Sequence, residues 1–164
     1  MPAGNTYTAI ATQTLGSAAA SVTFSSIPST YTDLVLVAAA IGTGDLQIYG
    51  RVNGDSGANY SNTFLAGNGT SASSIRQSNV NSFQGDYYLA VSADGGLTTY
   101  QFMNYSNTTT NKTILARSGL GNKGTNAIVN LWRNTAAINS IALTTSTSTF
   151  AIGSTFSLYG IAAA

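Results

Sequence analysis

The sequence predicts an all-β fold, a jelly-roll-like antiparallel β-sandwich, and three observations lead to that prediction. Thr, Val, Ile, Tyr and Phe, which suit a pleated surface, recur in short alternating runs along the chain. Gly, Asn, Asp and Ser separate these runs about every 8–12 residues, the spacing typical of sandwiches and barrels. Charged residues make up only 7% of the chain, and the absence of Glu removes much of the usual solvent-facing side of a helix.

The expected strands follow in order from the N-terminus. The first two, 6–15 and 21–27, alternate loosely, whereas 34–41 is a continuous apolar run, typical of a strand that is buried on both faces or closed by neighbours. The next strand, 46–52, alternates and leads into Asn53-Gly54-Asp55, whose residues favour the positive φ angles of a tight turn. Further strands are expected at 59–66, 83–92, 97–105, 113–118, 126–133, 138–143 and 155–161, with turns at 67–69, 94–96, 119–124 and 153–154.

Two Ser/Thr-rich segments, 71–74 and 144–149, are interpreted as loops. The result is about ten strands, a count that a jelly roll fits best. The 164 residues are enough for one core and too few for two comfortable ones, and no linker interrupts them. We therefore expect a single β-sandwich domain over residues 1–164.

The composition excludes several classes of function. There is no Cys and no His, which excludes disulfides, thiolate chemistry, a zinc finger and an imidazole relay. A formal net charge of +1 provides no strong field for nucleic acid or an acidic membrane surface, so neither partner is expected. The longest apolar run, 34–41, is too short to span a membrane, and the N-terminus lacks the pattern of a signal peptide. Synthesis in a cytoplasm is expected.

Charge is distributed unevenly along the chain. Residues 1–94 hold all five Asp with only Arg51 and Arg76, a net charge of −3, whereas residues 95–164 hold four cations and no acid, a net charge of +4. Two interpretations stay open. The cations are scattered over different strands by chance, or opposite faces of the protein meet head to tail in an assembly.

One short motif, Asp55-Ser56-Gly57-Ala58, spells the catalytic loop of aspartic proteases. In those enzymes an apolar strand leads directly into the Asp, whereas Asn53-Gly54 precedes it here, so we interpret the segment as a turn. A calcium site built from Asn53, Asp55 and nearby carbonyls stays open, although such sites usually hold more carboxylates.

Two further patterns suggest chemistry that their surroundings do not support. Residues 119–124, GLGNKG, match a dinucleotide-binding pattern, but an alternating strand rather than a helix follows, and no acid occurs after Asp94. A glycosidase needs two nearby carboxyls; most Asp lie at strand ends, and Asp86 alone has aromatic neighbours. We predict no enzyme activity, no catalytic residue, no cofactor and no metal site.

The aromatic residues are the best candidates for contacts with a partner. Tyr87, Tyr88 and Trp132 are suited to stacking on sugar rings, to the core, or to an interface with another protein. For Trp132, which lies between Leu131 and Arg133, core or interface is favoured over ligand.

Several segments carry a likeness to known proteins. They are IATQTL at 10–15, SVTFSSIPSTYTDLVLV at 21–37, RVNGDSGANYS at 51–61, NYSNTT at 104–109 with Lys112-Thr113, LWRNTAAINSI at 131–141 and GSTFSLYGI at 153–161. Together these resemble a group of small β-rich structural proteins of tailed bacteriophages, including phages of cyanobacteria, over nearly the whole chain.

The resemblance implies a non-enzymatic virion structural protein. Its stand-alone members resemble capsid cement (decoration) proteins, which implies a homotrimer on the capsid surface that binds and stabilises the shell of the major capsid protein. The expected partners are therefore further copies of the chain and that capsid protein. The alternative is a tail- or fibre-associated domain that binds host glycans, which predicts an open groove lined by Trp or Tyr beside Asp or Asn.

Overall fold

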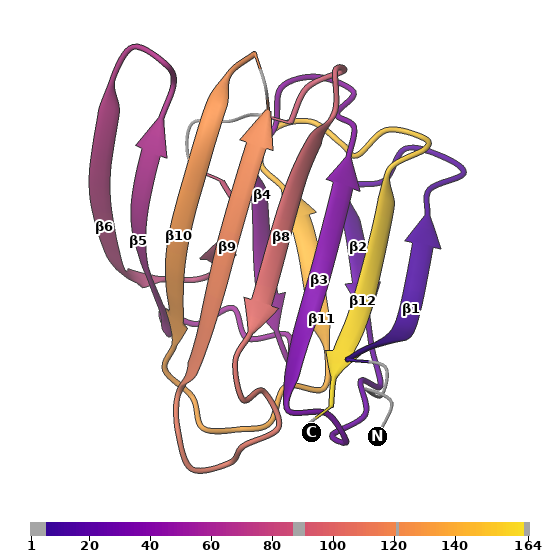
Figure 1. Ribbon diagram of the computed structural model, residues 1–164, viewed down its shortest axis with the longest axis vertical. Coiled ribbons are helices and arrows are strands. Elements are labelled where there is room, and N and C mark those ends of the chain that lie inside the picture. Colours follow the sequence, from indigo (N-terminus) through magenta and orange to yellow (C-terminus); the bar gives the residue numbers. More distant parts are fainter. Residues whose placement is uncertain (1–5, 87–90, 121, 163–164) are drawn as a thin grey trace.

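The computed structural model describes residues 6–86, 91–120 and 122–162 and has two layers of antiparallel β-strands (Figure 1). The all-β sandwich prediction is confirmed: every described strand pair is antiparallel, and these ranges contain no helix. It follows that this part of the chain holds no helix of the length and apolarity needed to cross a membrane.

Twelve strands are formed within the described ranges. They are β1 (Tyr7–Thr14), β2 (Ser21–Phe24), β3 (Asp33–Ala40), β4 (Ile48–Val52), β5 (Tyr60–Gly67), β6 (Ala72–Val80), β7 (Phe83–Gln84), β8 (Gly96–Phe102), β9 (Lys112–Leu120), β10 (Gly124–Trp132), β11 (Ile141–Thr145) and β12 (Thr155–Ile161).

The strands form one large and one small sheet. The large sheet has eight strands in the order β1-β12-β3-β8-β9-β10-β5-β6, and the small sheet has four in the order β2-β11-β4-β7. In Figure 1 the large sheet lies in front, with β6 and β1 at its two edges and the small sheet behind it. The large sheet therefore presents one face to the small sheet and the other to the outside.

Eight of the strands pair in a nested order. The first strand pairs with the last, β1 with β12, and inside that pair lie β2 with β11, β3 with β8, and β4 with β7. The other four strands form two hairpins, β5–β6 and β9–β10, which widen the large sheet beside β8. The small sheet contains none of these four strands.

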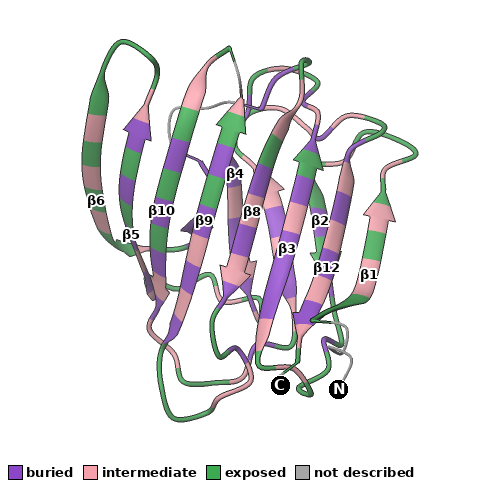
Figure 2. Ribbon diagram, in the orientation of Figure 1, coloured by how far each residue is buried: buried purple, intermediate pink, exposed green. Residues whose placement is uncertain are grey.

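The structure corrects the predicted elements mainly at one edge. Two segments were expected to form loops, 71–74 and 144–149. Residues 72–74 instead begin β6, a nine-residue strand, and Thr144 and Thr145 end β11. Of the strand expected at 83–92, only Phe83–Gln84 forms a named strand, β7, and residues 87–90 lie outside the described ranges. Figure 2 shows that β6 has no fully buried residue, because it lies at the edge of the large sheet and pairs with β5 alone. Its sequence therefore lacks the regular apolar alternation by which a strand is recognised.

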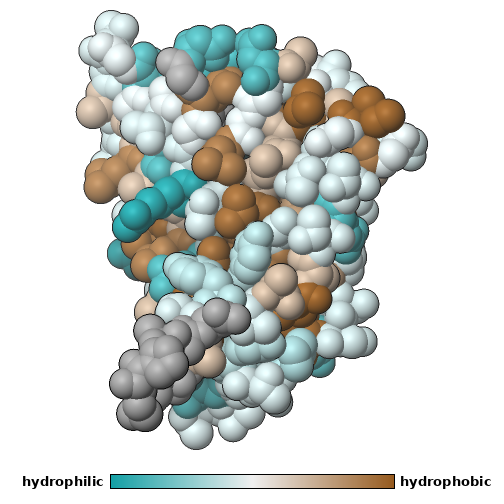
Figure 3. Space-filling model, turned by 45° about the vertical axis from the view of Figure 1, so that its right-hand side comes forward, coloured by the Kyte–Doolittle hydropathy of each residue, from teal (hydrophilic) through white to brown (hydrophobic). Residues whose placement is uncertain are grey.

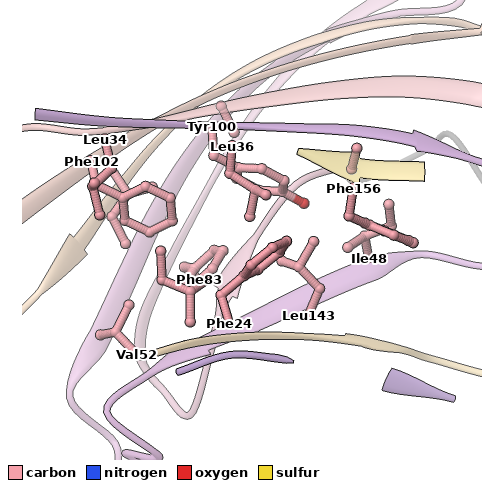
Figure 4. Close-up of a cluster of buried hydrophobic side chains, with 14 of the residues drawn as sticks. Phe24, Leu34, Leu36, Ile48, Val52, Phe83, Tyr100, Phe102, Leu143 and Phe156 are labelled. Carbon is pink, nitrogen blue, oxygen red and sulfur yellow. The ribbon is translucent and has the colours of Figure 1, made fainter. Parts of the chain in front are cut away.

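The core fills the space between the two sheets (Figure 4). The ring of Phe83 lies edge-on to those of Tyr100 and Phe102, with ring centroids 5.6 and 5.7 Å apart. Gly50 lies directly against the Phe83 ring, because a Cβ at Gly50 would be 2.0 Å from Phe83 Cζ. Gly50 and Phe83 are cross-strand partners in the small sheet, so the ring lies over the neighbouring strand β4 at a residue that has no side chain.

A buried amide links the two sheets at the edge of the small one. The backbone N–H of Gln84 donates to Asn130 Oδ1 at 2.9 Å, and Asn130 Nδ2 donates to the Gln84 carbonyl at 3.1 Å. Since Asn130 is fully buried on the inner face of β10, this pair of hydrogen bonds satisfies its polar atoms and fixes β7 against the large sheet.

Candidate assembly surface

The large sheet turns one face away from the core, and no described element covers it. We call this surface the open face; its outward residues are Ser74 and Arg76 on β6, Thr63 and Leu65 on β5, Ala127, Val129 and Leu131 on β10, Leu115 and Arg117 on β9, Leu97, Thr99 and Gln101 on β8, Val35, Val37 and Ala39 on β3, and Ser157 and Tyr159 on β12.

Large apolar side chains of the open face reach solvent. Leu65 is 62% exposed, Leu97 52% and Val129 51%, and the neighbouring Leu115 is half-buried. Figure 3, which turns the β1 edge forward, shows apolar side chains at the surface in separate patches among polar ones. Scattered apolar residues are ordinary on a protein surface, but a cluster of them on one uncovered sheet face is typical of an interaction site.

The strand register brings part of this cluster together. Leu65 lies opposite Ala127, and Ala127 lies opposite Arg117 on the next strand. One row away, Val129 lies opposite Leu115. Adjacent strands are about 4.8 Å apart, so these side chains are in reach of one another across β5, β10 and β9.

A shallow hollow of about 400 Å³ opens beside this cluster. Small residues, Gly67 and Ala72, leave the space at the end of β5 and the start of β6. The lining is mostly apolar, and it consists of Leu65, Ala66, Gly67, Ala72, Ser73, Arg117, Thr125, Asn126 and Ala127.

Two arginines on the open face have no partner within the described structure. Arg76 and Arg117 are exposed, and neither guanidinium makes a hydrogen bond or an ion pair with a described residue. The other cations are engaged: Lys123 pairs with Asp45 at 2.6 Å, and Arg133 donates to Asn79 Oδ1 at 2.9 Å. Lys112 is buried and donates to two backbone carbonyls, and burial lowers its pKa.

Most of the carboxylates, in contrast to these two arginines, bond groups within the chain. The Asn104 N–H donates to Asp33 Oδ1 at 2.6 Å, and Asn122 Nδ2 donates to Asp94 Oδ2 at 3.0 Å. Asp45 holds Lys123. Of the two unpaired cations, Arg76 belongs to the acidic part of the sequence and Arg117 to the basic part, so the charge asymmetry along the sequence does not account for them.

Asp55 is a structural residue of the turn between β4 and β5, as the turn interpretation predicted. Its Oδ1 accepts the Gly57 N–H at 2.8 Å, and its Oδ2 accepts the indole N–H of Trp132 at 2.7 Å. Burial alone raises the pKa of Asp55, but hydrogen bonds from Trp132, Asn59 and Gly57 outweigh it and lower the pKa below its ordinary value. The carboxylate that resembled a protease loop thus stays ionised to hold this loop together.

Of the three aromatic residues proposed for partner contacts, the structure places one. Trp132 is 1% exposed, stacks on Tyr60 with ring centroids 6.5 Å apart, and bonds Asp55 through its indole. It belongs to the core and presents almost no surface to a partner. Tyr87 and Tyr88 lie outside the described residues.

The other sequence motifs lie in structural surroundings that do not form the sites they suggested. Residues 119–124 join β9 and β10, two paired antiparallel strands, so no helix follows the glycines as a dinucleotide site needs. Asp86 is buried, its Oδ1 has no hydrogen-bond partner, and burial raises its pKa well above the ordinary value. Within the described ranges, no three acidic side chains converge in the way a metal site requires.

Sequence reasoning missed the open face, although one signal was present. The continuous run of β3 was interpreted as a strand buried on both faces or closed by neighbours. In the structure its inward residues Leu34 and Leu36 are fully buried, whereas Val37 is half-buried and Ala39 is exposed on the outer side. An apolar run can therefore also indicate a face that lies open in the isolated chain.

Comparison with known proteins adds no relative: the chain matches no protein-family model, and no curated protein is significantly similar to it in sequence. Its function is therefore argued from the open face and its charges.

Proposed function

We propose that this chain is a virion structural protein, a capsid cement protein that binds and stabilises a shell of major capsid protein through its surfaces and carries out no catalysis. The observation that carries the proposal is the open face, where an entire sheet surface exposes Leu65, Leu97 and Val129 without a covering layer. The likeness of several segments to phage structural proteins supports the choice of assembly.

We further propose that the eight nested strands are a jelly roll into which two hairpins are inserted. A jelly roll is a long antiparallel hairpin wound into two sheets, so its strands pair first with last and inward from there. The pairs β1–β12, β2–β11, β3–β8 and β4–β7 follow that order. In this interpretation β5–β6 and β9–β10 are additions that widen one sheet, and with it the open face.

The composition favours assembly through apolar contact and avidity. Only 7% of residues are charged, so few ion pairs are available to hold partners, and isolated surface pairs contribute little in any case. A homotrimer that touches several shell subunits at once gains affinity from multivalency even where each contact is modest. The location in this proposal is the outside of the capsid, after synthesis in the host cytoplasm.

The deciding experiment is an image reconstruction of the particle that carries this protein, combined with its copy number. The expected result is trimers on the shell, with a copy number close to that of the shell subunit. A few copies confined to the tail would overturn the proposal. Native mass spectrometry of the purified protein tests the trimer separately, and a monomer at micromolar concentration would contradict that part.

The alternative, a tail or fibre domain that binds host glycans, calls for an exposed aromatic platform. Trp132 is buried, and the hollow beside Leu65 is lined by no Trp or Tyr. Glycan-array binding by the purified protein would favour this alternative over cement, whereas the proposal expects no glycan to bind.

A further inference from the structure

We propose that the region of the open face between Arg76 and Arg117 docks an acidic, apolar segment of a different protein. The proposal rests on the function above, in which that protein is the shell subunit. We call this region the arginine-flanked patch, and it consists of Arg76, Leu65, Ala127, Val129 and Arg117.

The floor of the patch is apolar and free. Leu65 and Val129 are more than half exposed, at 62% and 51%, and Ala127 lies opposite Leu65 and two residues before Val129 on β10. The hollow of about 400 Å³ opens at Leu65 and Ala127, with Arg117 on its rim. Apolar side chains of a partner would therefore find apolar area and a shallow hollow here.

The two arginines stand on opposite sides of this floor. In one row of cross-strand neighbours, Leu65 on β5, Ala127 on β10 and Arg117 on β9 lie side by side. In the adjacent row, Arg76 on β6, Thr63 on β5 and Val129 on β10 lie side by side. Three strand spacings and one step of two residues separate the two Cα atoms, roughly 16 Å from the usual sheet dimensions. A bound segment that carries carboxylates about four or five residues apart in extended form spans that distance.

The chemistry of the missing partner follows from the unpaired guanidiniums. Arg presents its donors in a planar fork that matches a carboxylate, and a pair formed beside apolar contacts is shielded from water. Neither Arg76 nor Arg117 has a described partner in this chain. A segment that combines apolar side chains with Asp or Glu can pack on Leu65 and Val129 and also pair with both arginines.

A second copy of the chain has few carboxylates to offer this patch. The sequence has no Glu, and it has five Asp. Asp33, Asp45, Asp55 and Asp94 each bond a group of their own fold, and Asp86 is buried. A different protein, richer in acidic residues, therefore fits the patch better than a second copy does.

The test uses the whole protein with both arginines replaced, Arg76→Gln with Arg117→Gln. Saturation binding is measured on shells of the encoding phage that were assembled without this protein. Loss of two charge-assisted contacts is expected to weaken binding by at least about tenfold. A control on the other sheet is Arg51→Gln, which removes one positive charge from the outer side of the small sheet and is expected to bind as the unaltered protein does.

A second arm does not need shells. Two synthetic peptides of alternating residues, one of Leu with Glu and one of Leu with Gln, are titrated into isotope-labelled protein. The expected result is that the Glu peptide shifts the amide signals of Arg117, Ala127 and Leu65 at lower concentration than the Gln peptide, and that the double variant abolishes this preference.

The shell-binding and peptide experiments distinguish a failure of this inference from a failure of the cement function. If shells bind the unaltered protein and the double variant equally, the inference is overturned while the cement function stands. If the unaltered protein does not bind shells, the cement function fails, and the peptide arm alone decides the patch: no preference for Glu overturns it. A change in the oligomeric state of the double variant would identify a second copy as the occupant and would also overturn it.

Discussion

The outer faces of the two sheets differ, although both sheets contribute apolar side chains to the same core. The outward residues of the small sheet are mostly polar, such as Ser21, Thr23, Tyr49 and Thr144. The open face of the large sheet instead exposes Leu65 and several other apolar side chains.

This difference shows that the fold does not require apolar residues on the outer face of a sheet. An outward position on a sheet needs only a residue that tolerates the pleat, and the Thr and Ser residues of the small sheet meet that need without apolar surface. The polar groups there also find partners in the chain: Arg51 Nε donates to the Asn81 carbonyl, and the Tyr49 hydroxyl donates to Gln47 Oε1. The fold of this chain does not require the apolar residues and unpaired arginines of the open face, and these are the residues that the proposed partner would cover.

The largest expected effect is on the free energy of unfolding, and it differs between the two sides of strand β5. Phe64 faces the core from β5 and is 1% exposed, whereas the adjacent Leu65 faces outward. Phe64→Ala should lower the free energy of unfolding by about 3–5 kcal/mol, because it removes buried area and leaves a cavity. Leu65→Ser should change it by no more than about 0.5 kcal/mol. Urea denaturation measures both, and a large loss from Leu65→Ser would show that the open face is part of the folding core.

The next effect concerns a polar group that lies inside the sandwich. Burial raises the pKa of Asp86, so the folded state favours the neutral acid; its contribution to stability is present below the unfolded pKa and is lost as pH rises through the folded pKa. Asp86→Asn should therefore raise the free energy of unfolding at pH 7 by about 1–3 kcal/mol.

The pH profile provides the check on Asp86. The gain from Asp86→Asn should shrink as pH falls through the ordinary pKa of 3.8, because below that pH the unaltered side chain is neutral in both states. Asp55 supplies the opposite case, because its pKa is lowered and its stabilisation is lost on acidification. A gain from Asp86→Asn that does not change with pH would contradict an electrostatic origin.

A smaller effect tests the comparison of the two faces directly. Leu65→Ser with Val129→Thr removes apolar area from the open face, and binding to shells should weaken by about tenfold, since buried apolar area drives association. Ser21→Ala with Thr23→Ala alters the small sheet and should leave binding unchanged. Equal losses from both pairs of substitutions would mean that the two outer faces do not differ in role.

Much of the fold could be predicted from the sequence because its signals are local. Alternation located the strands that bury one face, and Asn53-Gly54 located a turn in which both residues have positive φ, 52° and 68°. The edge strand β6 could not be found this way: SSIRQS at 73–78 buries no residue fully, so its pairing with β5 leaves no apolar period in the sequence.

The candidate surface was harder to predict than the fold. Tyr87, Tyr88 and Trp132 were chosen because aromatic residues are common at interfaces, but a single sequence does not reveal which side of a strand faces the core. Trp132 turns inward to Tyr60 and Asp55, and Leu65 turns outward. Only the arrangement of the two sheets decides this, because it depends on which face the small sheet covers.

The smallest expected effect compares two cations, one paired within the chain and one unpaired. Lys123 bonds Asp45 at 2.6 Å, but the side chains are 30% and 65% exposed, so Lys123→Gln should lower the free energy of unfolding by at most about 0.5 kcal/mol. It should not alter shell binding, because its charge is already met by Asp45. Arg117→Gln should do the reverse, leaving urea denaturation unchanged and weakening binding. Since each substitution removes one positive charge, net charge alone predicts the same result for both, and only the position of the charge on the open face predicts a difference.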